Sequence, residues 1–377
     1  MKVLYITGPG MGGSNVSLKL TILELQKKGI KPIVVVPNIS IAHWFNENSI
    51  DTVVINFKFS IWQPHYAMFD KLVLPIRMLK NIAINMVAIV KLLLVMIKVS
   101  PDIVHTNISV LTVGYWAARI LHIPHVWHIR EYINKDFGYT PFPSFKFFSK
   151  RFLHEYCISI SRDLVEHFHI VSDKIKVIYN GVSTNSIELL PKENRFLFVG
   201  ALIPGKGIQD AVEGYISYLK MGGSYDLYVV GFGKEKFVNN LKLAIPEKYR
   251  MKVHFLGQRN DIYKLMSSSL AIIVPSFFEA FGRVTAEAML NSCLVIGRNT
   301  GGTKEQFDNG FDLCHKEIGL RFTTTKEIAY HLYDIEKKGI NFYQEMIKNA
   351  DYVASHLYAV EKNANNIYSF YKNMKNV

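Results

Sequence analysis

The chain has 377 residues, of which 49% are hydrophobic and 20% are charged, so it has enough apolar material for two packed domains and lacks the composition of a disordered protein. Its three cysteines, Cys157, Cys293 and Cys314, are scattered without metal-ligand spacing, which is typical of a reducing compartment rather than of a disulfide framework. The formal net charge is +13, and residues 1–185 hold 20 Lys and Arg against 11 Asp and Glu. This excess favours an anionic partner, and the absence of a nucleic-acid-binding motif argues against nucleic acid.

Short apolar segments alternate with segments of helical length along the chain. In the first half, strands are expected at 2–7, 32–37, 52–55, 103–105, 125–129, 156–160 and 176–179. Helical segments lie between several of them, notably at 14–28 and 69–99. The alternation begins again after 190–194, with strands expected at 195–199, 225–230, 253–256, 270–274 and 293–297. This order predicts an α/β protein with two doubly wound domains and parallel sheets.

The same pattern predicts the domain limits. We expect an N-terminal domain at 1–185, a second domain at 186–355 and a C-terminal helix at 356–377 that crosses back to the first domain. The last helical stretch, 341–374, is long enough for such a crossing. Because the first strand begins at residue 2, no secretory leader is expected, and the protein is predicted to be cytoplasmic.

Residues 71–99 form a very apolar segment that fits two interpretations. Polar residues recur in it at near-helical spacing and form one narrow stripe: Lys80, Asn81, Asn85, Lys91 and Lys98. The longest run without charge, 81–90, is too short to span a bilayer. The segment is expected either as a buried helix on a sheet or as a helix that also leans on an anionic membrane surface. Aromatic and basic residues interleave again at 137–152, which suits a lipid interface and a packed helix start equally well.

A glycine-rich turn follows the first strand and precedes a helical segment. Gly8, Gly10 and Gly13 match the GxGxxG pattern of dinucleotide-binding proteins. That interpretation requires an acid after the second strand, but none occurs there before Glu47. We therefore favour a backbone that approaches a phosphate or a sugar, with Gly12 and Gly13 nearest to the helix N-terminus.

Two glutamates, Glu279 and Glu287, stand eight residues apart directly after the apolar run 271–275. A helix cap and a solvated helix face would explain them without any function. An acid–base pair of the kind that glycosidases use is another interpretation, but nothing in the surrounding sequence supports it.

Across almost its whole length the chain resembles the retaining family 4 glycosyltransferases of the GT-B fold, of the type that assembles surface polysaccharides. The resemblance is carried, in order, by GPGMGGSN (8–15), PDIVHTN (101–107), WHIRE (127–131), VIYNGV (177–182), FVGALIPGKGIQDAVEGY (198–215) and VPSFFEAFGRVTAEAML (274–290). It implies two Rossmann-like domains whose parallel sheets face an interdomain cleft. It also implies a nucleotide-sugar as co-substrate, no cofactor and no metal.

The resemblance also implies roles for residues of the second half. Lys206 matches a phosphate-binding lysine, although a solvated turn lysine is the ordinary alternative. Glu287 matches the carboxylate that holds the nucleotide ribose, and Glu279 matches the one that faces the transferred sugar. The remaining residues expected to bind the donor are Phe281, Gly282, Arg283 and Val284, together with Gly12 and Gly13 of the first half.

In the first half, His128 matches the family's histidine near the transferred sugar, so the expected catalytic set is His128, Glu279 and Lys206. A buried core histidine is the ordinary alternative. His105 and Arg130 are expected on the acceptor side. The chain departs from the family at Ala201, where an arginine usually completes the phosphate clamp; Arg283 is a candidate substitute.

The leading hypothesis is a cytoplasmic glycosyltransferase that works at the inner face of the membrane and acts on a lipid-linked glycan or another glycan acceptor. Its expected partners are a nucleotide-sugar and an anionic membrane surface, without nucleic acid. A sugar-nucleotide epimerase of the same fold and a non-catalytic sugar-nucleotide-binding subunit are the alternatives. The donor base, the sugar and the acceptor are left open by the residues.

Overall fold

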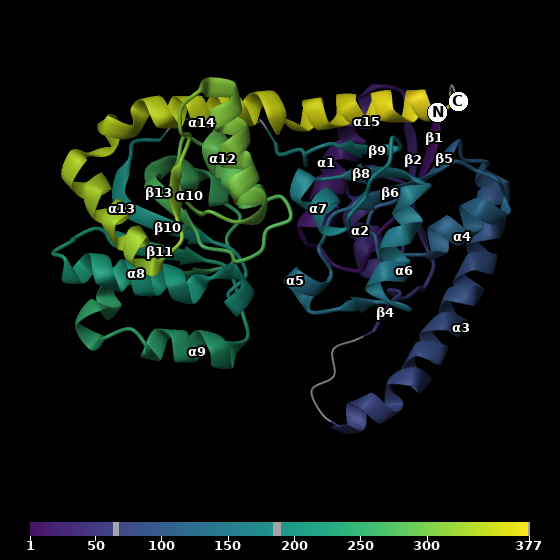
Figure 1. Cartoon of the computed structure of the whole chain (residues 1–377), viewed down its shortest axis with the longest axis horizontal. Coiled ribbons are helices and arrows are strands. Elements are labelled where there is room, and N and C mark those ends of the chain that lie inside the picture. The colour runs from purple at the N-terminus through teal and green to yellow at the C-terminus, as the bar shows by residue number, and fades with distance from the viewer. Residues whose placement is uncertain (63–67, 184–189, 376–377) are drawn as a thin grey trace. The chain divides into compact units, whose positions relative to one another are not determined.

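The computed structural model describes residues 1–62, 68–183 and 190–375, and it divides into two compact units (Figure 1). The first unit comprises Met1–Gly181 and Val360–Val377, and the second comprises Val182–Ala359. Each unit is an α/β domain of its own, built on one large parallel sheet.

Within the described residues, the first unit contains a seven-stranded parallel sheet in the order β3-β2-β1-β5-β6-β8-β9. The strands are β1 Lys2–Ile6, β2 Lys31–Val36, β3 Thr52–Val54, β5 Ile103–Thr106, β6 His125–Ile129, β8 Tyr156–Ser159 and β9 Ile175–Val177. A small antiparallel pair is formed by β4 Ile61–Trp62 and β7 Thr140–Pro141.

The helical elements of this unit include two at its chain ends, α1 and α15, which pack side by side (Figure 1). They are α1 Gly13–Lys27, α2 Ile39–Asn46, α3 Met68–Val99, α4 Val113–Ile120, α5 Asn134–Phe137, α6 Phe145–Lys150, η1 Arg151–Leu153, α7 Arg162–His167 and α15 Val360–Lys375.

Side-chain alternation along the strands explains why this sheet carries helices on both faces. Successive residues of a strand point to opposite sides. In β1, Val3 and Tyr5 therefore enter a core with α1, α2 and α15, whereas Leu4 and Ile6 enter a second core with α3 and α4. The strands are apolar on both faces because both faces are covered.

Within the described residues, the second unit contains a six-stranded parallel sheet in the order β12-β11-β10-β13-β14-β15. The strands are β10 Glu193–Val199, β11 Asp226–Val230, β12 Val253–Gly257, β13 Ser269–Val274, β14 Leu294–Arg298 and β15 Leu320–Phe322. The helical elements are η2 Pro204–Lys206, α8 Ile208–Lys220, α9 Glu235–Leu243, η3 Glu247–Lys252, α10 Ile262–Ser268, α11 Arg283–Leu290, α12 Gly301–Cys314, α13 Thr325–Lys338, η4 Ile340–Tyr343 and α14 Gln344–Leu357.

These sheets confirm the predicted pair of doubly wound α/β domains. Every predicted strand is present, with ends that differ by one or two residues. The short strands β4, β7 and β15 were not predicted; β4 and β7 have only two residues each, which gives no readable alternation.

The last helical stretch, expected at 341–374, is helical but is not one continuous helix. The segment contains η4, α14 and α15, and the chain is interrupted at Tyr358 and Ala359. There the Val182 amide donates to the Tyr358 carbonyl at 2.8 Å, and Val182 and Ala359 form a parallel bridge. A hydrogen bond from a distant segment thus takes the place of the helical one.

The helix α3 differs from the expectation of a buried helix for residues 71–99, whereas the expectation that it leans on a membrane surface stays a prediction. By length and composition, Val73–Val99 could cross a membrane, so the inference that it is too short was wrong; the charges are too sparse to break its apolar run. A fully buried helix is also wrong, because only 22% of its most apolar window is buried. The expected polar stripe is divided, since Asn85 faces the core and Lys80, Lys91 and Lys98 face solvent.

The aromatic segment 137–152 mostly packs inward. Phe148 and Phe152 are fully buried, and the ring of Phe145 stacks on that of Phe168 at 5.3 Å between centroids. Phe147 is the exposed exception, at 54%. The packed helix start is therefore the interpretation that the structure supports.

Candidate functional site

In the second unit, a candidate binding site lies at the carboxyl ends of β10 and β13, where the direction of the strand order reverses. From β10 the chain continues to β11 on one side, whereas β13 lies on the other side of β10. In open α/β sheets, ligands bind beyond the carboxyl ends of the strands at such a point. The helices α8, α11 and α12 follow β10, β13 and β14, so their N-termini begin at this edge and favour negative charge there.

The loop after β10 carries Lys206 to this edge. Lys206 ends the short helix η2, and Gly207 continues with a φ of 67°, a left-handed conformation that favours glycine. A Cβ on Gly207 would lie 2.1 Å from the Pro275 carbonyl oxygen, so the turn packs directly against the loop after β13. The glycine thereby brings the lysine beside the loop that contains Glu279.

Lys206 and Glu279 meet in the structure. The Lys206 Nζ lies 2.7 Å from the Glu279 Oε1, and the two side chains are 34% and 17% exposed. Both groups therefore remain accessible at the sheet edge, where a ligand's anionic and hydroxyl groups would compete for them.

The backbone of the loop after β13 is held by α12. The Gly302 amide donates to the Glu279 carbonyl at 2.6 Å. The Gln306 side-chain amide donates to the carbonyls of Phe281 and Gly282, at 2.5 and 3.0 Å. Phe281 is buried, and its ring forms a T-shaped pair with the ring of Tyr358. These contacts fix the loop before α11 begins.

The second glutamate lies on α11 with a cation beside it. Gly282 precedes the helix with a φ of 83°, and Arg283 and Val284 form its first turn. The Arg283 guanidinium lies 2.6 Å from the Glu287 carboxylate, and each side chain is 14% exposed. Burial raises the pKa of Glu287, and Arg283 opposes this shift. The structure thus pairs Arg283 with Glu287; whether the arginine also serves a phosphate stays a prediction.

The first unit has a comparable reversal between β1 and β5. The glycine turn after β1 is fastened by Asn15, whose amide donates to the carbonyls of Gly8 and Gly10 at 3.0 and 2.5 Å. Gly12 caps α1, which begins at Gly13, and a Cβ on Gly12 would meet nothing within 4 Å. The described part of the chain thus leaves open space beside this helix N-terminus, as a backbone-bound ligand requires.

His105, His128 and Arg130 lie together in the first unit, and each is at most 7% exposed. His128 is inside β6 and Arg130 follows the strand. The His105 Nε2 and the Arg130 guanidinium lie 3.0 and 3.2 Å from the His128 Nδ1. Arg130 also donates to the side-chain oxygens of Asn107, at 2.8 Å, and of Asn180.

The arginine determines the protonation pattern of this cluster. Arginine has no acceptor, so the His128 Nδ1 must accept, and a neutral His128 carries its proton on Nε2. His105 must then donate from its own Nε2, and its Nδ1 accepts from the Tyr371 hydroxyl at 2.5 Å. Burial and the charge of Arg130 lower the pKa of both histidines, which keeps them neutral.

The buried His128 Nε2 is the open end of this chain of hydrogen bonds. It has no hydrogen-bond partner among the residues that the structure describes. A buried N–H without an acceptor costs about 1–3 kcal/mol. The cluster therefore presents one N–H donor for which a ligand oxygen is the natural partner.

Glu131, next to Arg130, is held by a separate contact. Its carboxylate accepts from the Ser109 amide at 2.9 Å and from the Ser109 hydroxyl. Burial raises the pKa of Glu131 to about 7, and the two bonds from Ser109 oppose this shift.

Residues Asn107, Asn180 and Tyr371 were not recognised as members of the site from the sequence. Asn180 lies within the quoted segment 177–182. Asn107 ends the quoted segment 101–107, so its position after β5 was an available signal. No sequence signal pointed to Tyr371, because it lies 266 residues from His105 along the chain.

Comparison with known families matches both halves of the chain. The sequence model described as Glycosyltransferase Family 4 matches residues 11–186. The model described as Glycosyl transferases group 1 matches residues 183–352. Together they span well over half of the chain.

Curated relatives share part of the sequence. The chain is 30% identical over 167 residues to the O-antigen chain mannosyltransferase RfbU of Salmonella typhimurium, which covers 43% of this chain and 46% of that protein. It is 31% identical over 160 residues to an N-acetylgalactosaminyltransferase of Campylobacter jejuni that acts on N-acetylgalactosamine-N,N'-diacetylbacillosaminyl-diphospho-undecaprenol, covering 40% and 42%. The matches thus span less than half the length of these relatives.

Solved structures share the fold over the full length. HepE of Anabaena in complex with UDP has a TM-score of 0.75 at 20% identity, covering 98% of this chain and 99% of that one. A glycosyltransferase of Rickettsia africae has a TM-score of 0.77 at 19% identity, covering 99% and 98%. At such identities the likeness concerns the fold.

Proposed function

The chain belongs to the glycosyltransferases of the GT-B fold, with a family 4 half and a group 1 half, and we propose that it transfers a sugar from a nucleotide-sugar to a hydroxyl of a lipid-linked glycan. The sugar is a hexose or an N-acetylhexosamine, and the transfer retains the anomeric configuration. The product belongs to surface polysaccharide synthesis.

The observation that carries this proposal is the Lys206–Glu279 pair at the strand reversal of the second unit. Transfer of the sugar leaves a nucleoside diphosphate, whose growing negative charge must be stabilised in the transition state. Lys206 and the N-termini of α8 and α11 supply positive charge at that edge. When the diphosphate binds, Lys206 turns from Glu279 to the phosphate, which leaves the Glu279 carboxylate for the sugar.

The two carboxylates then have different tasks. Glu287 accepts hydrogen bonds from the ribose hydroxyls, and the neighbouring Arg283 favours its ionised form. Glu279 orients sugar hydroxyls and faces the positive charge that develops at the anomeric carbon. The backbone from Phe281 to Val284 meets the donor at the first turn of α11, where helix amides lack an intrahelical acceptor.

The remaining proposed roles belong to residues of the first unit. His128 donates its Nε2–H to an oxygen of the transferred sugar, and the leaving phosphate accepts the proton of the attacking hydroxyl. Arg130 and His105 contact the His128 Nδ1 and fix the orientation of its ring, and these two residues face the acceptor. Gly12 and Gly13 present backbone to the substrate at the N-terminus of α1.

The acceptor and its location are supported by two observations. One relative's name specifies a diphospho-undecaprenol acceptor. The excess of Lys and Arg in residues 1–185 favours an anionic surface. We therefore propose that the enzyme is cytoplasmic and works on the inner face of the membrane.

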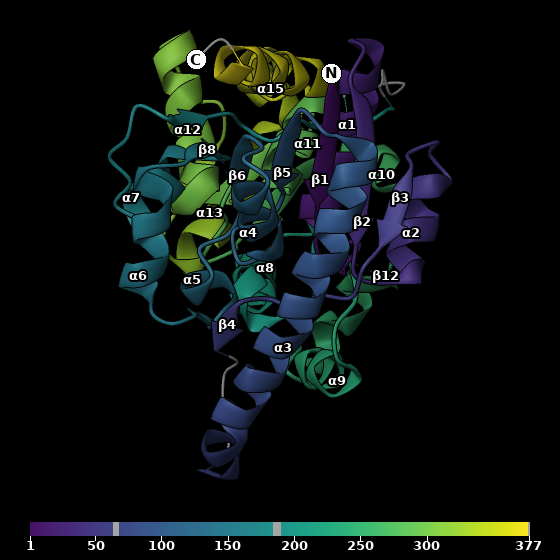
Figure 2. The same cartoon turned by 90° about the vertical axis from the view of Figure 1, so that its right-hand side faces the viewer.

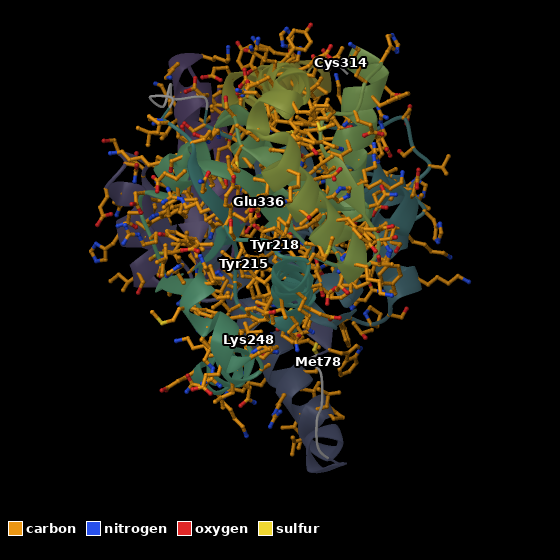
Figure 3. The ribbon with its side chains drawn as sticks, turned by 90° about the vertical axis from the view of Figure 1, so that its left-hand side faces the viewer. Met78, Tyr215, Tyr218, Lys248, Cys314 and Glu336 are labelled. Atoms are coloured by element: carbon orange, nitrogen blue, oxygen red, sulfur yellow. The ribbon has the colours of Figure 1, made fainter. Side chains whose placement is uncertain are left out.

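The test is transfer from labelled nucleotide-sugars to lipid-linked acceptors by the purified protein. Lys206→Ala and Glu287→Ala should each lower kcat/KM at least 100-fold, because each removes a charge from the donor site. Lys248→Ala is the matched control. This exposed lysine, labelled in Figure 3, lies in η3 directly before β12 and therefore at the amino ends of the strands. Activity should persist in EDTA, because the enzyme is proposed to need no metal or other cofactor.

Unchanged turnover in both site variants would remove Lys206 and Glu287 from the mechanism. A new free sugar-nucleotide formed without acceptor would instead indicate an epimerase. Donor binding without transfer to any acceptor would indicate a non-catalytic subunit.

A further inference from the structure

The outward face of α3 is a continuous apolar stripe. Its side chains are each between 58% and 68% exposed: Ile76, Leu79, Met86, Val90, Leu94 and Ile97. Their spacing of three, four or seven residues places them within one side of the helix. Figure 2 shows α3 along one side of the first unit, with its first turns extending beyond the sheet. Such a stripe is unusual on a protein surface that faces only water.

The opposite face of α3 is firmly attached to the unit. Ala88, Leu92 and Met96 are buried in the core with β1 and α4. The Asn85 side chain accepts from the Lys58 amide at 2.8 Å and donates to the Lys58 carbonyl at 3.0 Å. The exposed stripe is therefore not needed to attach α3 to the unit, because the opposite face of the helix already packs in the core.

Basic residues border the stripe in a row. Lys80, Lys91 and Lys98 are exposed and stand 11 and 7 residues apart, so they lie above one another on the same edge of the helix. No acidic residue occurs between Asp70 and Asp102. An apolar stripe with a cationic border is the pattern of a helix that lies in a lipid interface.

We propose that this face of α3 docks on an anionic lipid bilayer, with the helix axis along the membrane surface. The apolar stripe enters the boundary between headgroups and acyl chains, and the lysine row reaches the lipid phosphates. A membrane-spanning position would pull Asn85, Ala88 and Leu92 out of their contacts, so α3 lies on the bilayer. The docking deepens the proposed function, because it brings the first unit to a lipid-linked acceptor.

The test is cosedimentation of the full chain with vesicles, without donor or acceptor. Vesicles of phosphatidylcholine with about a third phosphatidylglycerol should bind the protein, and raised salt should weaken the binding. Leu79→Gln/Val90→Gln/Leu94→Gln should weaken binding at least tenfold. Lys80→Gln/Lys91→Gln/Lys98→Gln should weaken it roughly 100-fold on anionic vesicles, at about fivefold per lysine.

Matched controls distinguish docking through α3 from non-specific hydrophobic binding and from misfolding. Leu243→Gln/Met251→Gln removes exposed apolar groups of the second unit, at 69% and 85% exposure, and should leave binding unchanged. The substituted α3 residues are exposed, so the thermal unfolding of each variant should match that of the parent. Transfer to a soluble acceptor analogue, measured in parallel, reports on the proposed function alone.

Three results would overturn the proposal. Binding that is unchanged in both α3 variants would exclude the stripe. Loss of self-association in the apolar variant, with vesicle binding intact, would identify a second copy as the occupant. Protein that resists extraction from anionic vesicles by alkaline carbonate would indicate a spanning helix.

Discussion

At the scale of single residues, Arg130 has the widest influence, because it determines where the protons of two histidines lie. His128 must accept at Nδ1 and therefore donates at Nε2, which makes it a hydrogen-bond donor rather than a base in the resting enzyme. Tyr371, on α15, extends this chain of hydrogen bonds, because its hydroxyl donates to the His105 Nδ1. Tyr371 is thus expected to be a positioning residue that acts through His105.

Nitrogen NMR of histidine-labelled protein should find both His105 and His128 neutral at pH 7, with the proton on Nε2. Tyr371→Phe should change the Nδ1 signal of His105 and lower the transfer rate about tenfold, whereas Tyr368→Phe on the same helix should change neither. A proton on the His128 Nδ1 would contradict the assignment. Because the folded-state pKa of both histidines is lowered, the unfolded state binds more protons below about pH 6.5, so stability should fall with pH there.

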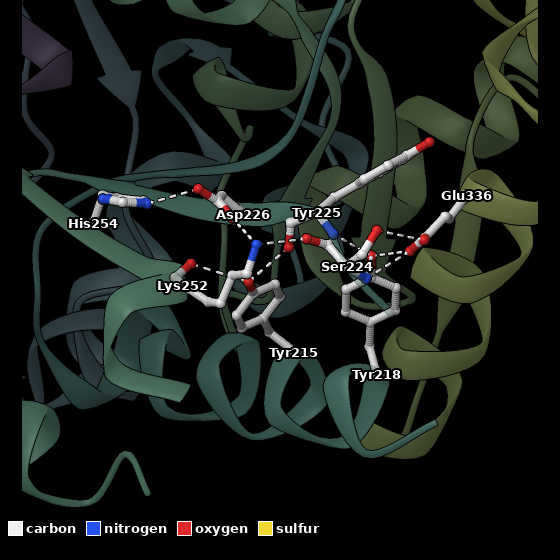
Figure 4. A network of polar contacts seen from close by, with 8 residues as sticks. All are labelled: Tyr215, Tyr218, Ser224, Tyr225, Asp226, Lys252, His254 and Glu336. Carbon is white, nitrogen blue, oxygen red and sulfur yellow. Dashed lines mark hydrogen bonds and ion pairs between the residues drawn. The ribbon is translucent and has the colours of Figure 1, made fainter. Parts of the chain in front are cut away.

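At the scale of elements, a polar network holds α8, β11 and α13 together (Figure 4). The Tyr218 hydroxyl lies between the Glu336 carboxylate and the amides of Ser224 and Tyr225, which are 3.0 and 2.9 Å from its oxygen. The Ser224 hydroxyl donates to Glu336 at 2.7 Å. Figure 3 shows Tyr218 and Glu336 close together. The amides that they contact precede β11, at its amino end, whereas Lys206 follows the carboxyl end of β10. The network therefore serves stability rather than binding.

Glu336→Gln should lower the free energy of unfolding of the second unit by about 1 kcal/mol at pH 7, because charge-assisted bonds become neutral ones at a half-exposed site. Burial alone would raise the pKa of Glu336, but the bonds from Tyr218 and Ser224 outweigh it and lower the pKa. The carboxylate's contribution is therefore present above the ordinary glutamate pKa and lost as pH falls through the lower folded-state value. Denaturant unfolding at pH 7 and pH 3 measures the difference in the free energy of unfolding between the parent and Glu336→Gln. The control is Glu247→Gln, at an exposed glutamate. An equal difference at both pH values would contradict the prediction.

At the scale of the whole molecule, the residues with proposed donor roles and the two histidines belong to different units. Lys206, Glu279 and Glu287 belong to the second unit, and His105 and His128 belong to the first. A donor nucleotide that binds the second unit should stabilise that unit's native state by mass action.

Calorimetry with UDP, GDP and ADP should reveal the donor base, because the correct nucleotide at about 100 times its Kd adds about 2.7 kcal/mol and raises Tm by several degrees. Lys206→Ala should reduce the shift, and Lys248→Ala should retain it. A parent protein without a shift for any nucleotide would contradict the proposed donor site.

The amino-acid sequence by itself determined the alternation of strands and helices and the segments that carry Lys206, Glu279 and Glu287. Periods of two and 3.6 residues are local, and each of these residues stands in or just after the loop that follows a strand. Only the tertiary structure decided the rest. Tyr371 meets His105 because α15 returns to the first unit, and the exposed side of α3 follows from which of its apolar faces packs on the sheet. Both depend on contacts between distant segments, which no local periodicity encodes.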